Sequence, residues 1–347
     1  MERIQQLRLC ATLPVIIAAC INTGHQFLIA ASAGADTVGD WRASLIQNFD
    51  IDPGQPGIVG VLVAGLVHLL PPLVVAIITG GVWERLFSEA RGRPLEKGFI
   101  YSAILFVLLM HPAIPLFHVV FGMSFAIVFG SAVFGGDGKT FVTPALLGAA
   151  VVQISFPAAL IGHPVWQGLN GHAGTSLFSL FHEQGSAALP WEGFEIGSAF
   201  IGNTQGMMGT TSVAAIIIAA VILIYGRLAS WRIVAGSLIG VIGAAIICNI
   251  IGDGILDMPW YWHLLAGSLI FGITFIATDP GASCVTNSGR WIQGVLTGLL
   301  LVLLRIVNPS HSDSMVPVLL LVSMLAPLID HGIIWLNIRN RMRSQVE

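Results

Sequence analysis

Residues 58–82 read IVGVLVAGLVHLLPPLVVAIITGGV and contain no charged side chain. In a helix, about 20 consecutive apolar residues are enough to cross the roughly 30 Å hydrocarbon core of a bilayer. The whole chain has this character, because 55% of its 347 residues are hydrophobic and only 10% are charged. Soluble domains carry about 25% charged residues. The stretch and the composition together predict a helical membrane protein.

Apolar runs of similar length recur along the chain and predict an all-α polytopic membrane protein with about ten transmembrane helices. Because the runs are continuous and do not alternate, a barrel of membrane strands is excluded. We expect a single integral membrane domain over 1–347, with five-helix halves at about 8–161 and 207–338 and a connecting loop at 162–206. The ten expected spans cover 8–31, 58–82, 98–114, 116–134, 143–161, 207–225, 232–251, 260–277, 291–306 and 315–336.

The distribution of Lys and Arg predicts that both termini lie on the cytoplasmic side. Basic residues concentrate in the cytoplasmic loops of membrane proteins. With this orientation, 13 of the 15 Lys and Arg residues fall in cytoplasmic segments, and only Arg42 and Arg305 fall on the outer side. The loop at 162–206 is then expected on the outer side of the membrane.

Three acidic residues, Glu84, Asp279 and Asp330, stand at the expected cytoplasmic ends of spans. An ionised side chain in or near hydrocarbon is expensive and is usually functional. Asp279 and Asp330 adjoin glycine or proline breaks, where freed backbone carbonyls could join a carboxylate in holding a cation. We therefore hypothesise a cation path through these acids. Ordinary solvation at the membrane interface is the alternative for each of them.

The cysteines predict no metal centre. Cys10, Cys20, Cys248 and Cys284 form no CxxC pair. Neither a structural zinc site nor a ligand set for an iron–sulfur cluster can be built from this spacing. We expect free thiols that pack as small apolar groups, with Cys284 as an exception in a polar loop.

Two glycine-rich segments each allow two interpretations. Gly80 and Gly81, followed by Trp83, could permit close helix packing, or could form a flat slot for an aromatic or quinone ring. The segment 202–212, GNTQGMMGTTS, could be a flexible helix entry, or its amide groups could bind a phosphate at a helix N-terminus. The residues alone leave both pairs of interpretations open.

The polar stretch NGHAGTSLFSLFH at 170–182 lies in the expected outer loop. It holds two histidines and three hydroxyl side chains and lacks any charge. Its glycines fit an ordinary loop. The adjacent hydroxyls of Thr175 and Ser176 point to a more specific role, which the residues alone do not identify.

The segment RIVNPSHSDSMVPVLLLVSMLAPLIDHGIIWLNIRNR at 305–341 resembles the C-terminal span of a known family. That family contains the B subunit of the Na⁺-translocating NADH:quinone oxidoreductase and, more distantly, the D subunit of the Rnf electron-transport complex. Further segments agree with it in the same order over nearly the whole chain. They are GGVWERLF (80–87), VFGGDGKTFVTPALLG (133–148), SAFIGN (198–203), ASWRIV (229–234), MPWYWHLLAGSLIFGITFIATDP (258–280) and TNSGRWIQG (286–294).

The resemblance implies that flavin mononucleotide (FMN) is joined through its phosphate to a side chain on the outer face of the membrane. The family motif reads Asp-Gly-x-Ser-Gly-Ala-Thr, and Ser176 stands at the position of its acceptor Thr. Serine keeps the hydroxyl that a phosphoester needs. The neighbouring Thr175 is the alternative acceptor, and a loop without covalent flavin is the third possibility. The motif's counterpart is Asn170, Gly171, His172, Ala173, Gly174, Thr175 and Ser176.

The resemblance also implies a riboflavin that is held without a covalent bond. Thr210 stands where the family usually has Glu, which puts Na⁺ coupling in question but leaves electron transfer intact. The remaining implied sites are quinone contacts at Gly80, Gly81 and Trp83 and cation-linked acids at Glu84, Asp279 and Asp330.

The implied function is that of a membrane flavoprotein subunit in a bacterial inner membrane, with the flavin loop on the periplasmic side. It would relay electrons through FMN and riboflavin toward quinone or a partner subunit, coupled to Na⁺ or H⁺ transport. Such a chain is not catalytic alone and needs the other subunits of an Nqr-like or Rnf-like complex and a flavin transferase. No nucleic-acid partner is expected. A ten-helix channel or secondary transporter, or a redox-complex scaffold without covalent flavin, are the alternatives.

Overall fold

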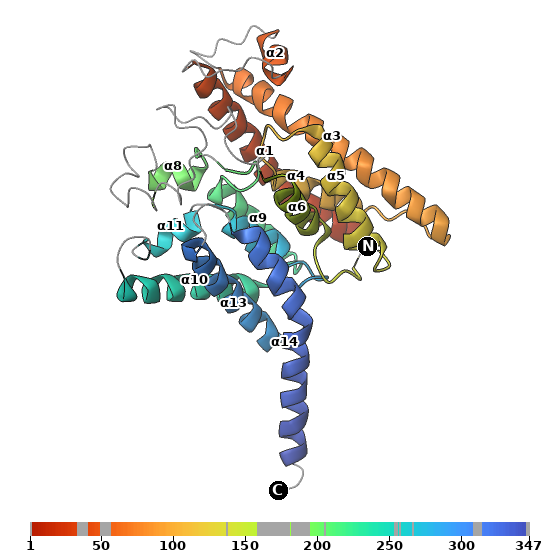
Figure 1. Cartoon of the computed structure of the whole chain (residues 1–347), viewed down its shortest axis with the longest axis vertical. Helices are drawn as coiled ribbons and strands as arrows, with labels where there is room; N and C mark the ends of the chain where they lie inside the picture. The colour runs from red at the N-terminus through yellow and green to blue at the C-terminus, as the bar shows by residue number, and fades with distance from the viewer. Residues whose placement is uncertain are drawn as a thin grey trace.

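The protein is described by a computed structural model, in which every regular element of the described chain is a helix (Figure 1). A chain of apolar helices satisfies its backbone hydrogen bonds internally, as a bilayer requires. The description covers residues 2–32, 41–48, 57–136, 138–157, 181, 195–204, 206–252, 256, 258–265, 267–307 and 314–344.

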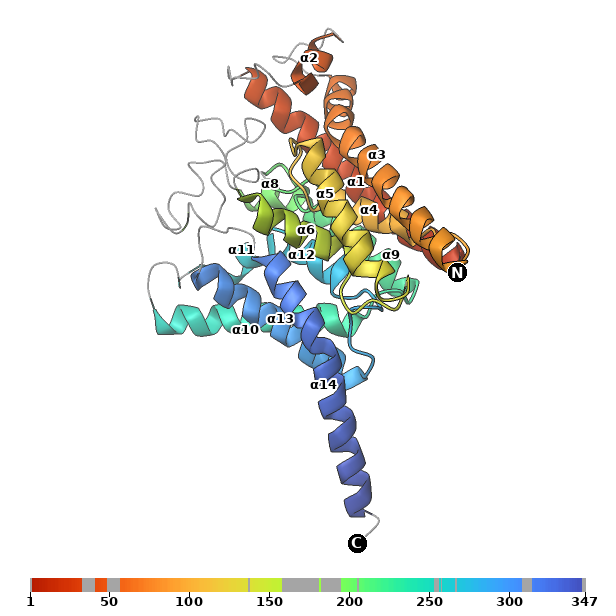
Figure 2. The same ribbon diagram turned by 45° about the vertical axis from the view of Figure 1, so that its right-hand side comes forward.

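The first half of the chain forms a group of helices around α1 and α3, which lie side by side in both views (Figures 1 and 2). Helix α5 continues without a break into the π-helix η1. The elements are α1 (Glu2–Ser32), α2 (Trp41–Gln47), α3 (Ile58–Arg91), α4 (Gly98–Leu108), α5 (Leu116–Ile127), η1 (Val128–Ala132) and α6 (Pro144–Ser155).

The second half is dominated by α10 and α13, which pack along each other, and by α14, which extends far beyond the rest of the molecule (Figure 2). The elements are α8 (Ile196–Ile201), α9 (Val213–Tyr225), α10 (Trp231–Ile251), α11 (Trp260–Leu265), α12 (Leu269–Phe271), the π-helix η6 (Gly272–Ile276), α13 (Asn287–Val307) and α14 (Met315–Ser344).

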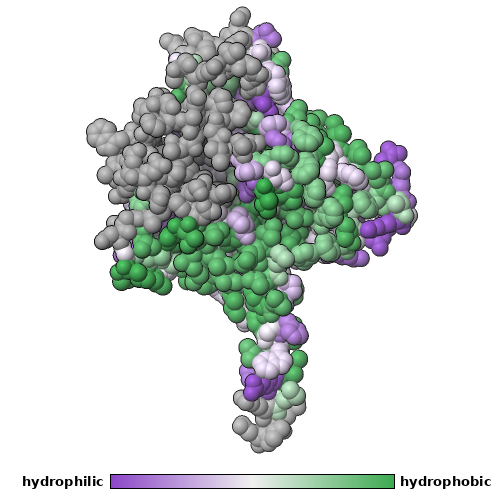
Figure 3. All heavy atoms as spheres, in the orientation of Figure 1, coloured by the Kyte–Doolittle hydropathy of each residue, from purple (hydrophilic) through white to green (hydrophobic). Residues whose placement is uncertain are grey.

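Apolar helices support the prediction of a polytopic membrane protein. Five described helices are long and apolar enough to cross a membrane, and shorter apolar helices lie in 98–108, 116–132, 144–155 and 213–225. Apolar side chains also cover much of the visible surface, while hydrophilic ones gather at the free ends of α3 and α14 (Figure 3). The five long helices are Ile4–Ser32, Ile58–Arg91, Trp231–Ile251, Asn287–Val307 and Met315–Met342.

Two of the expected spans are broken. The span expected at 98–114 ends as a helix at Leu108, because the following HPAIP segment brings two prolines that cannot donate a backbone hydrogen bond. The span expected at 260–277 is divided into α11, α12 and η6, and Gly267 lies between the first two with φ +77°. Each of the ten expected ranges contains a helix, but ten complete crossings stay a prediction.

A distant segment supplies hydrogen-bond donors to the backbone carbonyls that are left open after α4. The amide of Gly209 donates to the carbonyl of Leu108 at 2.8 Å, and the amide of Met208 donates to the carbonyl of Met110 at 3.0 Å. Carbonyls that a broken helix leaves open must find a partner inside a membrane protein. The chain before α9 supplies it, so the two halves share backbone hydrogen bonds.

Glycines allow α10 and α13 to touch backbone to backbone. A Cβ on Gly240 would overlap the carbonyl oxygen of Val295, and a Cβ on Gly298 would overlap that of Ser237. Small residues spaced four apart permit this close approach in membrane helices. The same device joins α1 and α3, where Gly65 lies against the carbonyl of Cys20.

The two basic residues expected on the outer side are both buried. Arg42 donates to the carbonyl of Ile114 at 2.9 Å. Arg305 donates to the carbonyl of His263 at 2.7 Å. Both therefore bind backbone carbonyls within the protein and are not free loop charges.

Candidate functional site at the predicted cytoplasmic end

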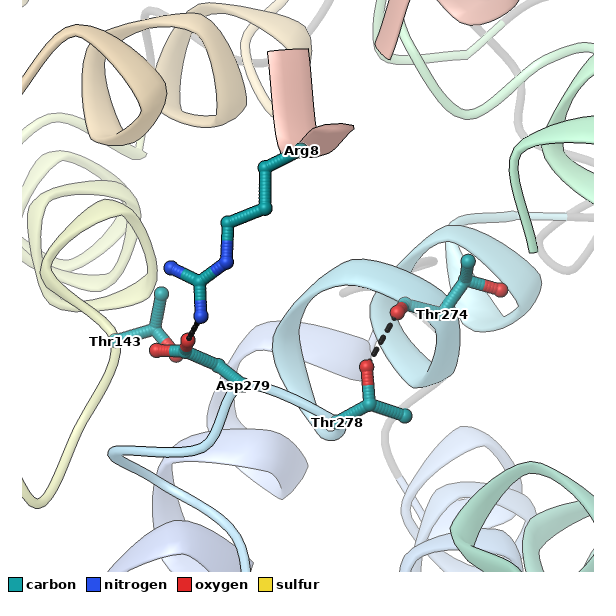
Figure 4. Close-up of polar contacts among 5 residues, drawn as sticks. All are labelled: Arg8, Thr143, Thr274, Thr278 and Asp279. Atoms are coloured by element: carbon teal, nitrogen blue, oxygen red, sulfur yellow. Dashed lines mark hydrogen bonds and ion pairs between the residues drawn. The ribbon is translucent and has the colours of Figure 1, made fainter. Parts of the chain in front are cut away.

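Asp279 follows directly on a widened helical turn. In η6 the amide of Ala277 donates to the carbonyl of Gly272 at 2.8 Å, five residues back, and Pro280 prevents the helix from continuing. The hydroxyl of Thr278 donates to the carbonyl of Thr274 at 2.6 Å and so stays within the helix (Figure 4). The aspartate is thereby placed at the helix end, with its carboxylate directed to other segments.

The Asp279 carboxylate joins three segments of the chain (Figure 4). Arg8 of α1 places Nη2 3.3 Å from Oδ1, and the hydroxyl of Thr143 donates to Oδ2 at 3.3 Å. The side chains of Arg8 and Asp279 are only 18% and 13% exposed. The Arg8 guanidinium also lies 5.4 Å from the ring centre of Tyr101. A cation that binds this carboxylate would therefore have to compete with a partly buried guanidinium.

Asp330 of α14 has a different environment. Its carboxylate accepts from the amide of Val285 at 2.6 Å, from the amide of Thr286 at 3.0 Å and from the Thr286 hydroxyl. These donors lie at the entry to α13, where unsatisfied amide groups and the helix dipole favour a negative charge. Asp330 thus fixes the loop before α13 to α14, and its oxygens are already occupied by the protein.

The loop between the two aspartates is held by Gln293, a residue that the sequence patterns did not mark as functional. Gln293 is 1% exposed; its Oε1 accepts from the amide of Cys284 at 2.7 Å, and its Nε2 donates to the carbonyls of Ala277 at 3.4 Å and Ala282 at 3.5 Å. The sequence signal that could have identified Gln293 is an amide side chain in the middle of an apolar helix.

The thiol of Cys284 lies in the same loop. Burial, followed by the nearby charge of Asp330, raises the pKa of Cys284 to about 12.

The structure brings Asp279 and Asp330 to one loop, whereas Glu84 lies on α3, which packs against α1, α4 and α5. Within the described residues, no group of three or more His, Cys, Asp or Glu side chains could hold a metal ion. Arg8 and Thr143 are further members of the site that sequence reasoning missed. Their partner lies more than a hundred positions away, so no local pattern could identify them.

The glycine pair of α3 is covered by an aromatic ring of the protein itself. A Cβ on Gly80 would lie 2.7 Å from Cε of Met123 and 3.3 Å from the ring of Phe99, and a Cβ on Gly81 would lie 3.4 Å from the same ring. The indole of Trp83 donates to the hydroxyl of Ser124 at 2.9 Å. The glycines thus pack against the ring of Phe99, and a quinone contact at this place stays a prediction.

The glycine-rich segment before α9 makes hydrogen bonds within the protein. The Ser212 hydroxyl accepts from the amide of Ala215 at 3.3 Å, and the Thr210 hydroxyl donates to the carbonyl of Met207 at 3.2 Å. Gly209 lies against Leu108. The helix entry is thus capped by its own serine, which favours an ordinary helix entry over phosphate binding.

The predicted flavin residues, from Asn170 to Ser176, lie outside the described residues. The described chain that follows them makes a polar contact with the C-terminal part of α1. Asn203 Oδ1 lies 3.0 Å from Nδ1 of His25 and accepts from Nε2 of Gln26 at 3.1 Å, and Asn22 donates to the carbonyl of Thr204 at 3.1 Å. The polar interruption NTGHQ within the first apolar run was the sequence signal for this contact.

Comparison with known proteins identifies the family. Residues 1–338 match the NQR2, RnfD, RnfE family. The chain is 38% identical to a protein of Ectopseudomonas mendocina over 96% of this chain and 84% of that protein, and 37% identical to one of Azotobacter vinelandii over 100% and 87%. A protein of Chromohalobacter salexigens is 35% identical over 96% of this chain and 81% of its own length.

All three relatives are named as the B subunit of a Na(+)-translocating NADH-quinone reductase, and each is therefore a subunit of an oxidoreductase complex. The matched region extends over both glycine-rich segments and includes Asp279 and Asp330. The resemblance inferred from the separate sequence segments is confirmed. This chain belongs to the NQR2, RnfD, RnfE family.

Proposed function

We propose that this chain is the B subunit of a Na⁺-translocating NADH:quinone reductase and that it relays electrons toward quinone in a bacterial inner membrane. The observation that carries the proposal is the similarity to proteins of that name over nearly the full length of the chain. The apolar helices fit a subunit that is embedded in the bilayer. The other subunits of the complex would supply the NADH site.

We also propose FMN, joined through its phosphate to Ser176, and a noncovalent riboflavin as the cofactors of the chain. The support for the first is the sequence NGHAGTS at 170–176, which keeps a hydroxyl at the acceptor position of the family motif. Bound flavins would supply the electron-transfer chemistry. The chain's own part is to offer the Ser176 hydroxyl to a flavin transferase, with Thr175 as the adjacent hydroxyl, and to hold the loop on the periplasmic side.

For cation coupling, the geometry favours Asp279 over Asp330 as the acid that exchanges partners. The partners of Asp279 drawn in Figure 4 include a guanidinium and a hydroxyl, and both belong to side chains that can move. Asp330 is held by two backbone amides, which are fixed by the fold. Na⁺ or H⁺ would replace Arg8 at the Asp279 carboxylate, and Thr143 would supply a further oxygen.

For the quinone, the flat surface of Gly80 and Gly81 supports a binding site beside Trp83 and near Glu84. The two glycines already accept the ring of Phe99. A quinone ring has a similar flat shape, so it would occupy this surface when Phe99 moves away. Glu84 lies one helical turn after Gly80 on α3 and is half-buried.

The decisive experiment is flavin fluorescence of the denatured protein in a gel, after coexpression with a flavin transferase. Wild type is compared with Ser176→Ala and Thr175→Ala on the same gel. We expect a fluorescent band that Ser176→Ala abolishes and Thr175→Ala retains. A dark wild-type band beside a fluorescent control substrate of the transferase would refute the covalent flavin. Copurification of the partner subunits would then indicate a scaffold, and its absence a transporter.

A further inference from the structure

A cavity of about 320 Å³ lies between the α9–α10 turn and the loop that precedes α13. Ligand sites in proteins typically have volumes of about 300–1,000 Å³. The cavity borders the loop of the candidate site through Thr278, Cys284 and Val285, but neither Asp279 nor Asp330 lines it. Arg227 and Ser230 line it from the turn, and Ser283 and Arg290 line it from the loop.

The lining of the cavity is basic. It includes two arginines and two serines and no acidic side chain among the described residues. Asp330 is held on the loop by the amides of Val285 and Thr286 and is not part of the lining. Two guanidinium groups beside hydroxyl donors are the chemistry that binds phosphate oxygens. The charge of the cavity therefore selects an anion.

The backbone orients the guanidinium of Arg290 and fixes the main chain of Arg227. Nε of Arg290 donates to the carbonyl of Cys284 at 3.0 Å, which orients its guanidinium while the terminal amino groups stay available to a ligand. Arg227 has φ +57°, a left-handed conformation that residues other than glycine rarely adopt. The turn fixes this conformation, because the amides of Leu228 and Ala229 both donate to the carbonyl of Leu223, at 2.9 and 3.2 Å.

Ser230 adds an unsatisfied hydroxyl to the cavity. It stands directly before α10, and its side chain does not cap the helix. Its Oγ is buried and has no hydrogen-bond partner among the described residues. A buried hydroxyl without a partner costs free energy, and rotation of the Ser230 side chain toward an anion in the cavity would remove that cost. The first amides of α10 add a partial positive charge.

The aromatic residues beside the cavity are of the kind that gathers at the level of lipid headgroups. Tyr225 and Trp231, at the two ends of the turn, are 92% and 51% exposed. The rings of Trp231 and Trp291 meet edge to face with their centres 5.6 Å apart. Tyr and Trp concentrate at the interface between membrane and water, and basic pockets on the cytoplasmic side of membrane proteins bind anionic headgroups.

We propose that this cavity binds a phosphate group, and that the headgroup of an anionic phospholipid supplies it. The site goes beyond the proposed electron transfer and does not depend on it. Arg227 and Arg290 neutralise the charge of the phosphate, and the hydroxyl of Ser230 donates to one of its oxygens. The bound lipid joins the α9–α10 turn to the loop that carries Asp279.

The test uses the full-length chain, purified in a nonionic detergent, and measures the midpoint of thermal unfolding. The probes are short-chain phosphatidylglycerol, short-chain phosphatidylcholine and inorganic phosphate. The variants are Arg227→Gln, Arg290→Gln and Ser230→Ala. The matched control is Arg232→Gln, because Arg232 lies two positions from Ser230, stacks on Trp231 at 5.2 Å and does not line the cavity.

We expect phosphatidylglycerol to raise the midpoint of the wild type and of Arg232→Gln, and to raise that of Arg227→Gln and Ser230→Ala much less. Phosphatidylcholine should raise none of them comparably. Arg227→Gln is the decisive variant, since Arg290→Gln also loses the bond to Cys284 and could weaken the fold. If inorganic phosphate raises the midpoint of unfolding as much as phosphatidylglycerol does, the phosphate site is supported but the phospholipid is overturned as its source. An equal rise with phosphatidylglycerol in wild type, Arg227→Gln and Ser230→Ala would overturn the proposal.

Discussion

Arg8 and Asp279 lie 271 positions apart in the sequence, and their side chains meet at 3.3 Å. The contact fastens the beginning of α1 to the loop before α13. It joins a basic and an acidic group that are both mostly shielded from water. Removing either group leaves the other charge without this counterion in a poorly solvated place. Loss of Arg8 should strengthen the binding of a cation, whereas loss of Asp279 should weaken it.

We predict that Arg8→Gln increases the apparent affinity for Na⁺ and that Asp279→Asn decreases it. Each change should also cost about 1–3 kcal/mol of stability, between the values for exposed and fully buried ion pairs. Na⁺-dependent quinone reduction by the assembled complex, measured over a range of Na⁺ concentrations, checks the prediction. An Asp279→Asn complex with an unchanged Na⁺ dependence would contradict it.

Asp330 is predicted to act mainly as an anchor for the loop before α13. Asp330→Ala removes the acceptor for one exposed amide, one part-buried amide and a hydroxyl, and each such hydrogen bond contributes about 0.5–1.5 kcal/mol. We expect a clear loss of thermal stability in the purified chain. Glu89→Gln is the control, because the Arg85–Glu89 pair is exposed and should contribute little to stability. Equal effects of the two changes would exclude the anchor role.

The crossing of α10 and α13 gives a comparison within one helix. Gly240→Ala places a methyl group against the carbonyl of Val295, whereas Gly243→Ala meets nothing within 4 Å. Overpacking typically costs about 1–3 kcal/mol, while alanine in an open helix position gains up to about 1 kcal/mol over glycine. The free energy of unfolding should therefore decrease in Gly240→Ala and increase in Gly243→Ala. A neutral Gly240→Ala would show that the helices are not in close contact.

Cys284 is predicted to react slowly with maleimide. Burial and the nearby Asp330 raise its pKa from 9.0 to about 12, so the reactive thiolate is scarce in the folded protein at pH 8. As the pH rises from 9 toward 12, an unfolded thiol ionises first, which favours the unfolded chain. A variant with Ala at Cys10, Cys20 and Cys248 isolates the group. Labelling should be slow in detergent and fast after denaturation, and rapid labelling of the folded protein would refute the burial.

Sequence patterns predicted the helices well where an apolar run was long and unbroken, as in 58–82. They did not reveal that the helix beginning at Gly98 ends at Leu108. The prolines of HPAIP were visible in the sequence. The amides that donate to the carbonyls left open by the helix break belong to Met208 and Gly209, about a hundred positions later. Local patterns carry no information on such a partner.

The candidate site shows the same limit. Asp279 and Asp330 could be found as charges beside helix breaks, because such charges are rare in an apolar chain. Their different roles depend on neighbours that only the fold brings close, namely Arg8 and Thr143 for one and the α13 entry for the other. Gln293 was visible as a polar residue. Its role in holding the loop depends on hydrogen bonds to the backbone of Cys284, Ala277 and Ala282, which only the fold brings close.

The glycine crossings also restrict how the molecule can move. Where main-chain atoms of two helices touch, as at Gly240 and at Gly65, no change of side-chain rotamer can absorb a displacement, so each crossed pair behaves as a rigid body. One such body lies in each half of the chain. A rearrangement during turnover must therefore pass through softer joints, and the two backbone hydrogen bonds that Leu108 and Met110 accept from Gly209 and Met208 are one place where the halves would part.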